Sequence, residues 1–421
     1  MSFRELHRNL KLRIGVGFFQ RFFDIMLVPL MVIHFSRLYG PATAGLMTLV
    51  VAVATVGCNL VGGHLSDVYG RRRVLMAGEI GVFLSYVGLA LVNSPLLHSG
   101  PATYALYLSA ACMAGLALPA NEAMIVDVST PESRTAVYTI NYWVINVAFM
   151  LGSLVGGFFY EGYFFQLLTA AAIATGGIFL VTFLALSETA PPEAARNPRG
   201  VRPALRGYLT VARDRVFLRL VLAALLVWSV EVQISSYLAV RLGSDFPEQQ
   251  LALGFWQVTV DGVNVLGILR AVNTLLVVIC GLWVGKLLGR LDERLRLVAG
   301  VVIFTAGYMA WALGDNAWLM ITAAVVVTLG ELMNQPVNQT LVAALVPADA
   351  RTKYMAAYGL HVRLGYMVGS LSVILGSVVD SWVMALLYAA FGAAAILLYL
   401  QLFRIQDARA AAGQPKAEAG A

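Results

Sequence analysis

A short polar segment between two long apolar runs constrains this chain most. Residues 62–73 read Gly-Gly-His-Leu-Ser-Asp-Val-Tyr-Gly-Arg-Arg-Arg. One apolar run ends near Gly63 and the next begins at Val74. A segment this short and this basic is typical of a turn that joins two membrane helices on the side where positive charge is retained. The chain is therefore expected to be an all-α membrane protein.

The composition favours the same class. Hydrophobic residues make up 59% of the chain and charged residues 12%, about half of the ~25% that is usual in soluble domains. At ~20 apolar residues per span, about twelve spans fit. We predict them at 13–35, 42–63, 74–93, 102–127, 136–159, 165–186, 216–240, 263–285, 297–313, 317–343, 354–378 and 382–403.

The basic residues are distributed unevenly between the two sides of this arrangement. Of the 29 Lys and Arg residues, 24 lie in or beside the segments predicted on one side. This asymmetry predicts that both termini are cytoplasmic. Because the positive charge lies at helix ends, the net charge of +6 indicates no nucleic-acid partner. The three cysteines lie inside apolar runs, so we expect neither a disulfide framework nor a metal site.

The longest polar break predicts how the chain is divided. Residues 187–215 are rich in Pro, Ala and Arg and are expected to be a cytoplasmic linker between two six-helix halves, 1–186 and 216–403. Residues 404–421 are expected to be a disordered cytoplasmic tail. Matches at a constant offset of 217 relate the halves as parallel, pseudo-symmetric repeats: Pro119 with Pro336, Arg134 with Arg351, and Gly152 with Gly369.

Ionisable residues inside spans are the candidate functional residues, since each costs roughly 2.5–3.5 kcal/mol to insert. Glu331 lies near the middle of the tenth span, Arg270 in the eighth and Glu231 in the seventh. Burial favours the protonated form of a carboxyl group, which suits a proton-coupled carrier. Arg270 is expected to pair with Glu331, Glu231 or an anionic substrate. The alternative is a set of structural carboxylates and ion pairs.

Further polar and aromatic residues are candidates for the cavity or for an inner latch. Asp24 forms part of a cavity wall or pairs with Arg21 three residues earlier on the same helical face. Asp67 is expected to cap the adjoining helix, and Glu79 to be ion-paired or to extend its head toward water. The aromatic residues pack in the protein or line a pocket for flat cations. The expected cavity residues are Glu331, Asn334, Asn338, Asn141, Tyr142, Trp143 and Trp228.

Two motifs resemble those of the major facilitator superfamily. Gly-x-Leu-x-Asp-x-x-Gly-Arg-Arg at 63–72 resembles motif A, and Gly-Ser-Leu-Val-Gly-Gly at 152–157 resembles motif C of drug/proton antiporters, with Ser153 in place of proline. Residues 8–15, 123–127, 141–143 and 328–331 resemble the LmrP-type bacterial multidrug transporters. The motif A resemblance implies a latch that holds one access state, formed with the inner end of the fourth span: Gly63, Asp67, Gly70, Arg71, Arg72, Asp127 and Arg134.

The resemblance also implies a function. In the LmrP type, acids equivalent to Asp67, Asp127 and Glu331 and a base equivalent to Arg270 serve proton coupling or switching. Asn141 and Ser235 or Ser236 stand here where that type has acids, so we expect that either Glu231 or Asp24 carries part of the proton pathway or fewer protons are exchanged in each cycle. The chain is expected to be a monomeric, multi-pass exporter of hydrophobic, often cationic compounds in the bacterial inner membrane, driven by protons without a cofactor.

Other functions remain open from the sequence. A carrier for a native metabolite, peptide, sugar or lipid, working by symport or flipping, has the same motif A. A receptor or scaffold that transports nothing has no need to bury Glu331 and Arg270. No catalytic motif indicates an enzyme.

Overall fold

The computed structural model describes residues 8–127, 131–188, 213–253, 256–288, 291–346 and 351–411. The chain forms two compact units, Met1–Val201 and Arg202–Ala421, and each is described by itself. The predicted 187–215 linker lies largely outside the described residues, so its structure stays a prediction.

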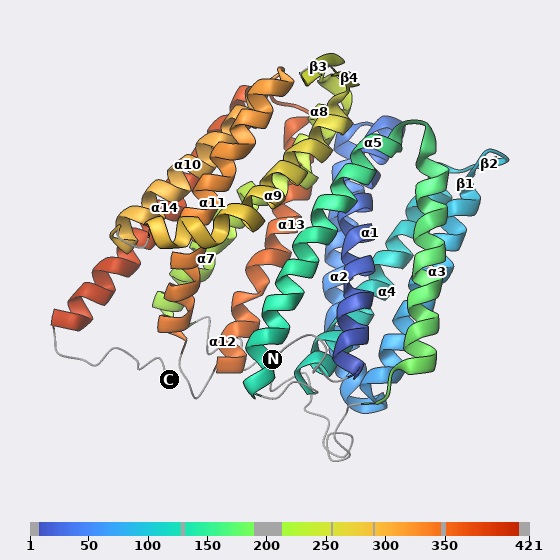
Figure 1. Cartoon of the computed structure of the whole chain (residues 1–421), viewed down its shortest axis with the longest axis horizontal. Coiled ribbons are helices and arrows are strands. Elements are labelled where there is room, and N and C mark those ends of the chain that lie inside the picture. Colours follow the sequence, from blue (N-terminus) through green and yellow to red (C-terminus); the bar gives the residue numbers. More distant parts are fainter. Residues whose placement is uncertain are drawn as a thin grey trace. The chain divides into compact units, whose positions relative to one another are not determined.

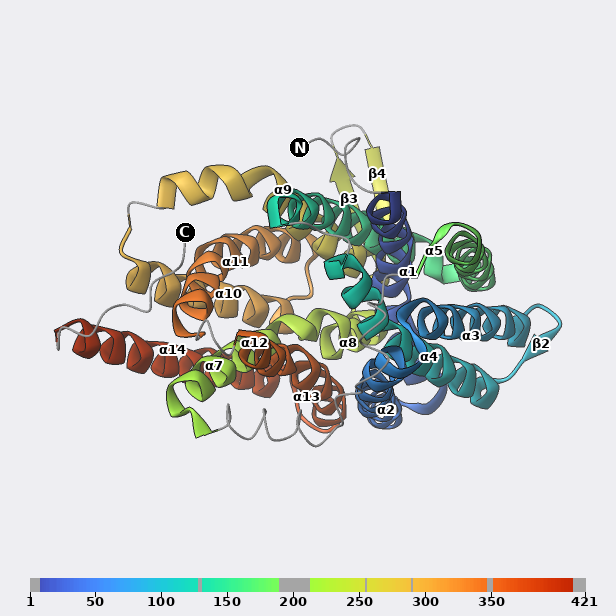
Figure 2. The same cartoon turned by 90° about the horizontal axis from the view of Figure 1, so that it is seen from below.

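Unit 1 is built from long helices (Figure 1). Its α3 packs along α4, and a hairpin of two short strands joins the ends of these two helices (Figure 2). Helix α5 is interrupted at Glu161, Gly162 and Tyr163, where Gly162 has a φ of 80°. It therefore contains the two spans predicted at 136–159 and 165–186. The elements are α1 (Arg8–Tyr39), α2 (Pro41–Tyr69), α3 (Arg71–Val92), β1 (Asn93–Ser94), β2 (Leu97–His98), α4 (Gly100–Asp127) and α5 (Pro131–Ala185).

Unit 2 contains the remaining spans and a second hairpin (Figure 1). Within it α10 packs against α11 and α14, and α11 packs against α9. The elements are α7 (Arg215–Glu231), the 3-10 helix η3 (Val232–Ser235), α8 (Tyr237–Asp245), β3 (Gln249–Leu253), β4 (Trp256–Val260), α9 (Gly262–Leu288), α10 (Glu293–Leu313), α11 (Ala317–Leu345), α12 (Arg351–Tyr358), α13 (Leu360–Gly376) and α14 (Ser381–Ala411).

The predicted class of fold is confirmed, with local differences. Ten described helices are long and apolar enough to cross a membrane, and α13 is a shorter apolar helix. Because α5 contains two helical segments separated by its interruption, it provides two spans. A described helical segment therefore corresponds to each of the twelve predicted spans. The two hairpins were not predicted, and the seventh span changes to a 3-10 helix after Glu231 and leaves helical geometry at Ser236. Helix α14 continues to Ala411, so the prediction of disorder from position 404 is wrong for its first residues.

The polar segment at 62–73 joins two helices as predicted, but most of it is helical and not a turn. Helix α2 continues to Tyr69 and α3 begins at Arg71, so Gly70 alone joins them, with a φ of 92° that favours glycine. The backbone N–H groups of Arg71 and Arg72 donate to the two carboxylate oxygens of Glu188, at 3.2 and 3.1 Å. Glu188, rather than the predicted Asp67, therefore caps α3.

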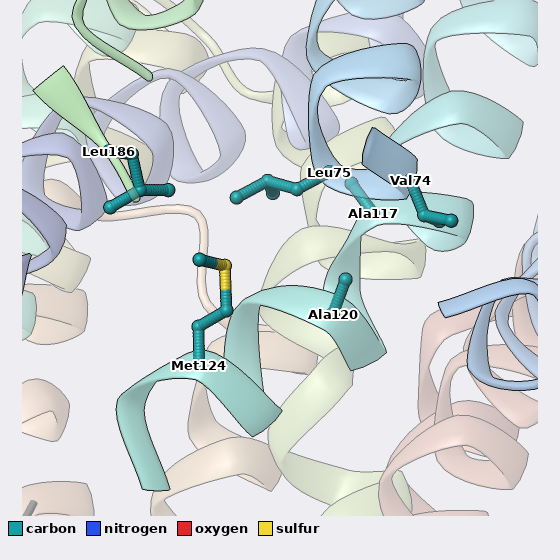
Figure 3. Packing of buried hydrophobic residues seen from close by; sticks show 6 residues of the cluster. All are labelled: Val74, Leu75, Ala117, Ala120, Met124 and Leu186. Atoms are coloured by element: carbon teal, nitrogen blue, oxygen red, sulfur yellow. The ribbon is translucent and has the colours of Figure 1, made fainter. Parts of the chain in front are cut away.

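A cluster of buried apolar side chains lies beside this connection in unit 1. It consists of Val74, Leu75, Ala117, Ala120, Met124 and Leu186 (Figure 3). Because most of these residues come from α3 and α4, the cluster joins the beginning of α3 to the last turns of α4. Leu186 brings the end of α5 to the same place, close to the Glu188 cap.

Close packing of α2 against α4 makes Gly62 a sensitive position. A Cβ atom at Gly62 would overlap the carbonyl group of Leu116 in α4, whereas at Gly57 on the same helix nothing lies within 4 Å. We expect Gly62→Ala to lower the unfolding temperature in detergent, because the helices must separate. Gly57→Ala is the matched control and should leave it unchanged or raised, since alanine favours the helix by ~0.5–1 kcal/mol. Equal unfolding temperatures of the two variants would contradict this packing.

Candidate functional site

The seventh span is interrupted beside one of the predicted acids. Glu231 is the last residue of α7, and η3 follows before α8 begins at Tyr237. The hydroxyl of Tyr308 in α10 donates to the backbone carbonyl of Glu231 at 3.0 Å. Gln233 is fully buried and donates from Nε2 to the carbonyl of Ser229, at 2.8 Å, and to Ser372 Oγ, at 3.0 Å. These partners stabilise a helix break that would be costly in an apolar medium.

Three predicted ionisable residues form one cluster in unit 2. Glu231 in α7 lies within electrostatic range of both Glu331 in α11 and Arg270 in α9. Arg270 also acts on Glu331. With both carboxyl groups ionised, two negative charges meet one positive charge, so the cluster has a net charge of minus one. The structure therefore brings these residues together, while their roles in transport stay predictions.

An amide that the sequence analysis missed is part of the cluster. Asn273 Nδ2 donates to Glu331 Oε2 at 2.9 Å and to Thr328 Oγ1 at 3.1 Å. Asn273 follows Arg270 by three residues, and Thr328 precedes Glu331 by three, so each pair lies on one helical face. In the sequence, the signal that could have identified Asn273 is its position one helical turn from an intramembrane charge. The Tyr308 contact had no comparable signal in the sequence.

The other predicted cavity residues of unit 2 have partners in the helix packing. Asn334 is 4% exposed and donates to the carbonyl of Gly330 on its own helix. Asn338 is 9% exposed, donates to Tyr358 Oη and accepts from Tyr399 Oη. Both amides are thus buried by hydrogen bonding within unit 2, and a role in substrate binding stays a prediction.

Trp228 lies three residues before Glu231 in α7. Its ring makes edge contacts with His361 and Tyr366 of α13. Its Nε1 is buried and has no hydrogen-bond partner in the described part of the chain. Trp228 is therefore packed against α13, and its place in a substrate cavity stays a prediction.

The candidates of unit 1 lie apart from the unit 2 cluster along the chain. Asp24 is exposed on α1, where Arg21 acts on it electrostatically. Trp143 is exposed on α5, and Asp67 on α2. Asp127 ends α4, and α5 contains Arg134, Asn141 and Tyr142; the side chains of these four lie outside the described residues. The latch of motif A stays a prediction.

A buried ion pair in unit 1 explains Glu79. Arg13 Nη1 of α1 lies 3.3 Å from Glu79 Oε1 of α3, and the two side chains are 2% and 3% exposed. Arg13 also donates from Nη2 to Asn121 Oδ1 of α4. The ion-pairing alternative for Glu79 is thus confirmed, and extension toward water is wrong. Arg13, Glu79 and Asn121 together connect α1, α3 and α4 near the beginning of α1.

A second polar feature of unit 1 is a cavity of about 410 Å³ beside the α5 interruption. Its lining includes Arg37, whose Nη1 atom lies 2.6 Å from Glu161 Oε1. The Arg37 guanidinium also lies over the ring of Tyr160. None of the predicted site residues lines this cavity. In the described ranges, no group of three or more His, Cys, Asp or Glu is placed to hold a metal ion.

Comparison with known proteins gives the relationship of the chain. It is 27% identical over 98% of its length, and 100% of the relative, to a Na⁺, Li⁺, K⁺/H⁺ antiporter of Planococcus maritimus. It is 23% identical over 74% of its length, and 71% of the relative, to the multidrug resistance protein MdtH of Sodalis glossinidius.

Solved structures show the same fold at lower identity. A POT family transporter in complex with 5-aminolevulinic acid matches with a TM-score of 0.75 and 15% identity over 96% of each chain. The model of the Major Facilitator Superfamily matches residues 14–313 and 256–420. With its multi-pass helical fold, this chain belongs to the Major Facilitator Superfamily of transporters.

Proposed function

We propose that this chain is a proton-coupled antiporter that exports cationic, hydrophobic compounds by alternating access. The observation that carries the proposal is the cluster of Glu231, Arg270 and Glu331 within the spans of unit 2. Its single excess negative charge provides a site for one positive charge. A proton and a cationic substrate can then occupy it in turn, which is the requirement for their exchange.

Two cargo classes are supported by different observations. Multidrug efflux is supported by the MdtH relative and by the resemblance to LmrP-type transporters. Alkali cations are the second candidate, because the relative named for Na⁺, Li⁺, K⁺/H⁺ antiport aligns over its whole length. The carboxylates, the Asn273 amide and the Thr328 hydroxyl also supply oxygen atoms, the ligand type that hard cations prefer.

The proposal includes a cellular setting. The described spans make the chain a multi-pass membrane protein, and the similarity to bacterial transporters supports the bacterial inner membrane. The charge asymmetry of the sequence supports cytoplasmic termini. The transporter is proposed to act as a monomer, without a cofactor.

The test uses purified full-length protein in liposomes that are acidic inside and contain a pH dye. Tetraphenylphosphonium, ethidium, NaCl, LiCl, KCl, a dipeptide and a sugar are added outside in separate experiments. Proton efflux triggered by the lipophilic cations is the expected result. Efflux triggered only by alkali salts would establish the second candidate. A response only to the dipeptide or sugar, or no response at all, would contradict cation/proton antiport.

A further inference from the structure

We propose that Glu231 carries the exchanged proton, while Glu331 stays ionised as the partner of Arg270, so that the cluster attracts cationic cargo when Glu231 is deprotonated. This inference rests on the proposed proton coupling and divides the two acids by role. The sequence places Glu331 nearer the middle of its span and allows Glu231 to carry part of the proton pathway, without dividing the roles of the two acids. The preference comes from the different surroundings of the two carboxyl groups.

Glu331 has a hydrogen-bond donor fixed in place. Asn273 Nδ2 donates to Glu331 Oε2 at 2.9 Å. The same amide nitrogen donates to Thr328 Oγ1, whose hydroxyl donates to the carbonyl of Ala324 at 2.7 Å. Because Thr328 uses its proton on Ala324, it can only accept from Asn273, so the amide must present N–H groups. A donor to a carboxyl oxygen stabilises its ionised form.

The carboxyl group of Glu231, in contrast, has an oxygen atom without a hydrogen-bond donor among the described residues. Its Oε2 is buried and has no hydrogen-bond partner in the described part of the chain. The hydroxyl of Tyr308, which could have served this oxygen, donates to the backbone carbonyl of Glu231 instead. A buried carboxylate oxygen without a donor is costly when ionised.

A neighbouring charge adds to this difference. Glu331 lies within electrostatic range of Glu231, and a nearby negative charge disfavours ionisation of a second carboxyl group. The missing donor and the neighbouring Glu331 thus act in one direction on Glu231.

The charged and titratable groups around Glu231 fit this assignment. The elements packed against α7 or the cluster provide Arg270 from α9, Tyr308 from α10, Glu331 from α11, His361 from α13 and Tyr388 from α14. One proton on Glu231 leaves Glu331 and Arg270 as an electrically neutral pair. Its release restores one negative charge, which attracts the cation.

Infrared difference spectroscopy of the full chain in lipid, recorded as a pH titration without cargo, tests the assignment. Protonated buried carboxyl groups absorb apart from carboxylates, so each titrating group gives a band that is lost as the pH rises. We expect Glu231→Gln to lack one band of the wild-type protein, and Glu331→Gln to keep it. The exposed Glu248→Gln is the matched control: it should lose only the contribution of Glu248 itself and keep the band that Glu231→Gln lacks. Size-exclusion profiles and unfolding temperatures check that each variant is folded.

Asn273→Leu provides an independent arm. Removing the donor should let Glu331 take up a proton, so an additional titrating band should appear that is absent from the Asn273→Leu, Glu331→Gln double variant. A band that persists in Glu231→Gln but is lost in Glu331→Gln would overturn the assignment, as would its loss in both. Because no cargo is used, a silent transport assay would contradict the proposed function and leave this result standing.

Discussion

Replacing Glu331 with glutamine is expected to abolish cation-driven proton efflux in liposomes. Glutamine has nearly the same shape but no charge, so the cluster keeps only Glu231 against Arg270 and no longer has an excess negative charge to attract a cation. We expect the initial rate to fall at least tenfold, equivalent to ~1.4 kcal/mol, and to approach that of protein-free liposomes. The rate is measured with the internal pH dye.

Glu248→Gln makes the same chemical change at an exposed position of unit 2 and should transport at the wild-type rate. Both variants must be reconstituted at equal protein density, with the orientation checked by protease accessibility. Efflux at the wild-type rate from Glu331→Gln would show that the charge of this carboxylate is not needed for exchange.

The second large effect is expected from the buried ion pair of unit 1. Glu79→Leu leaves the Arg13 guanidinium buried at 2% exposure with no carboxylate beside it. Breaking a buried pair by removing one partner costs ~3–5 kcal/mol, so we expect a poor yield of folded protein and a much lower unfolding temperature. The Arg13→Met, Glu79→Leu double variant should recover most of the loss, because it buries no charge.

Unit 1 itself supplies the control for this experiment. Arg37 and Glu161 form an ion pair whose side chains are 41% and 49% exposed, and exposed pairs contribute ~0–1 kcal/mol. Glu161→Leu should therefore shift the unfolding temperature little. If both single variants lose the same stability, burial is not what distinguishes the two pairs.

The sequence predicted the fold class because hydrophobicity and loop charge act over whole spans. A span needs ~20 apolar residues wherever it lies in the chain, so all twelve could be placed without knowing a contact. The ends of helices follow other rules. Polar residues such as Asp67 and Tyr69 interrupt the apolar pattern without ending α2, because a helix can extend past the apolar core of the bilayer into water.

The charges of the candidate site were predicted from the sequence, whereas their pairing could be predicted only as a set of alternatives for Arg270. An intramembrane Glu or Arg is visible in any sequence because it is costly, and Glu231, Arg270 and Glu331 were found in this way. Their grouping depends on how α7, α9 and α11 pack, which one sequence does not specify. The neutral hydrogen-bond partners of these charges are harder still to predict from the sequence. Asn273 and Tyr308 carry no charge, so mainly the contacts they make distinguish them.

The different connections at the two ends of α3 decide where a reporter group can be attached. The Gly70 connection has no spare residue, and its neighbouring N–H groups are already held by Glu188. An inserted tag there would break the cap and separate α2 from α3. The opposite end is permissive: Leu96, between β1 and β2, is 96% exposed. A cysteine or short epitope at this position could be labelled from one side of the membrane only, and so would read out the orientation of the whole chain.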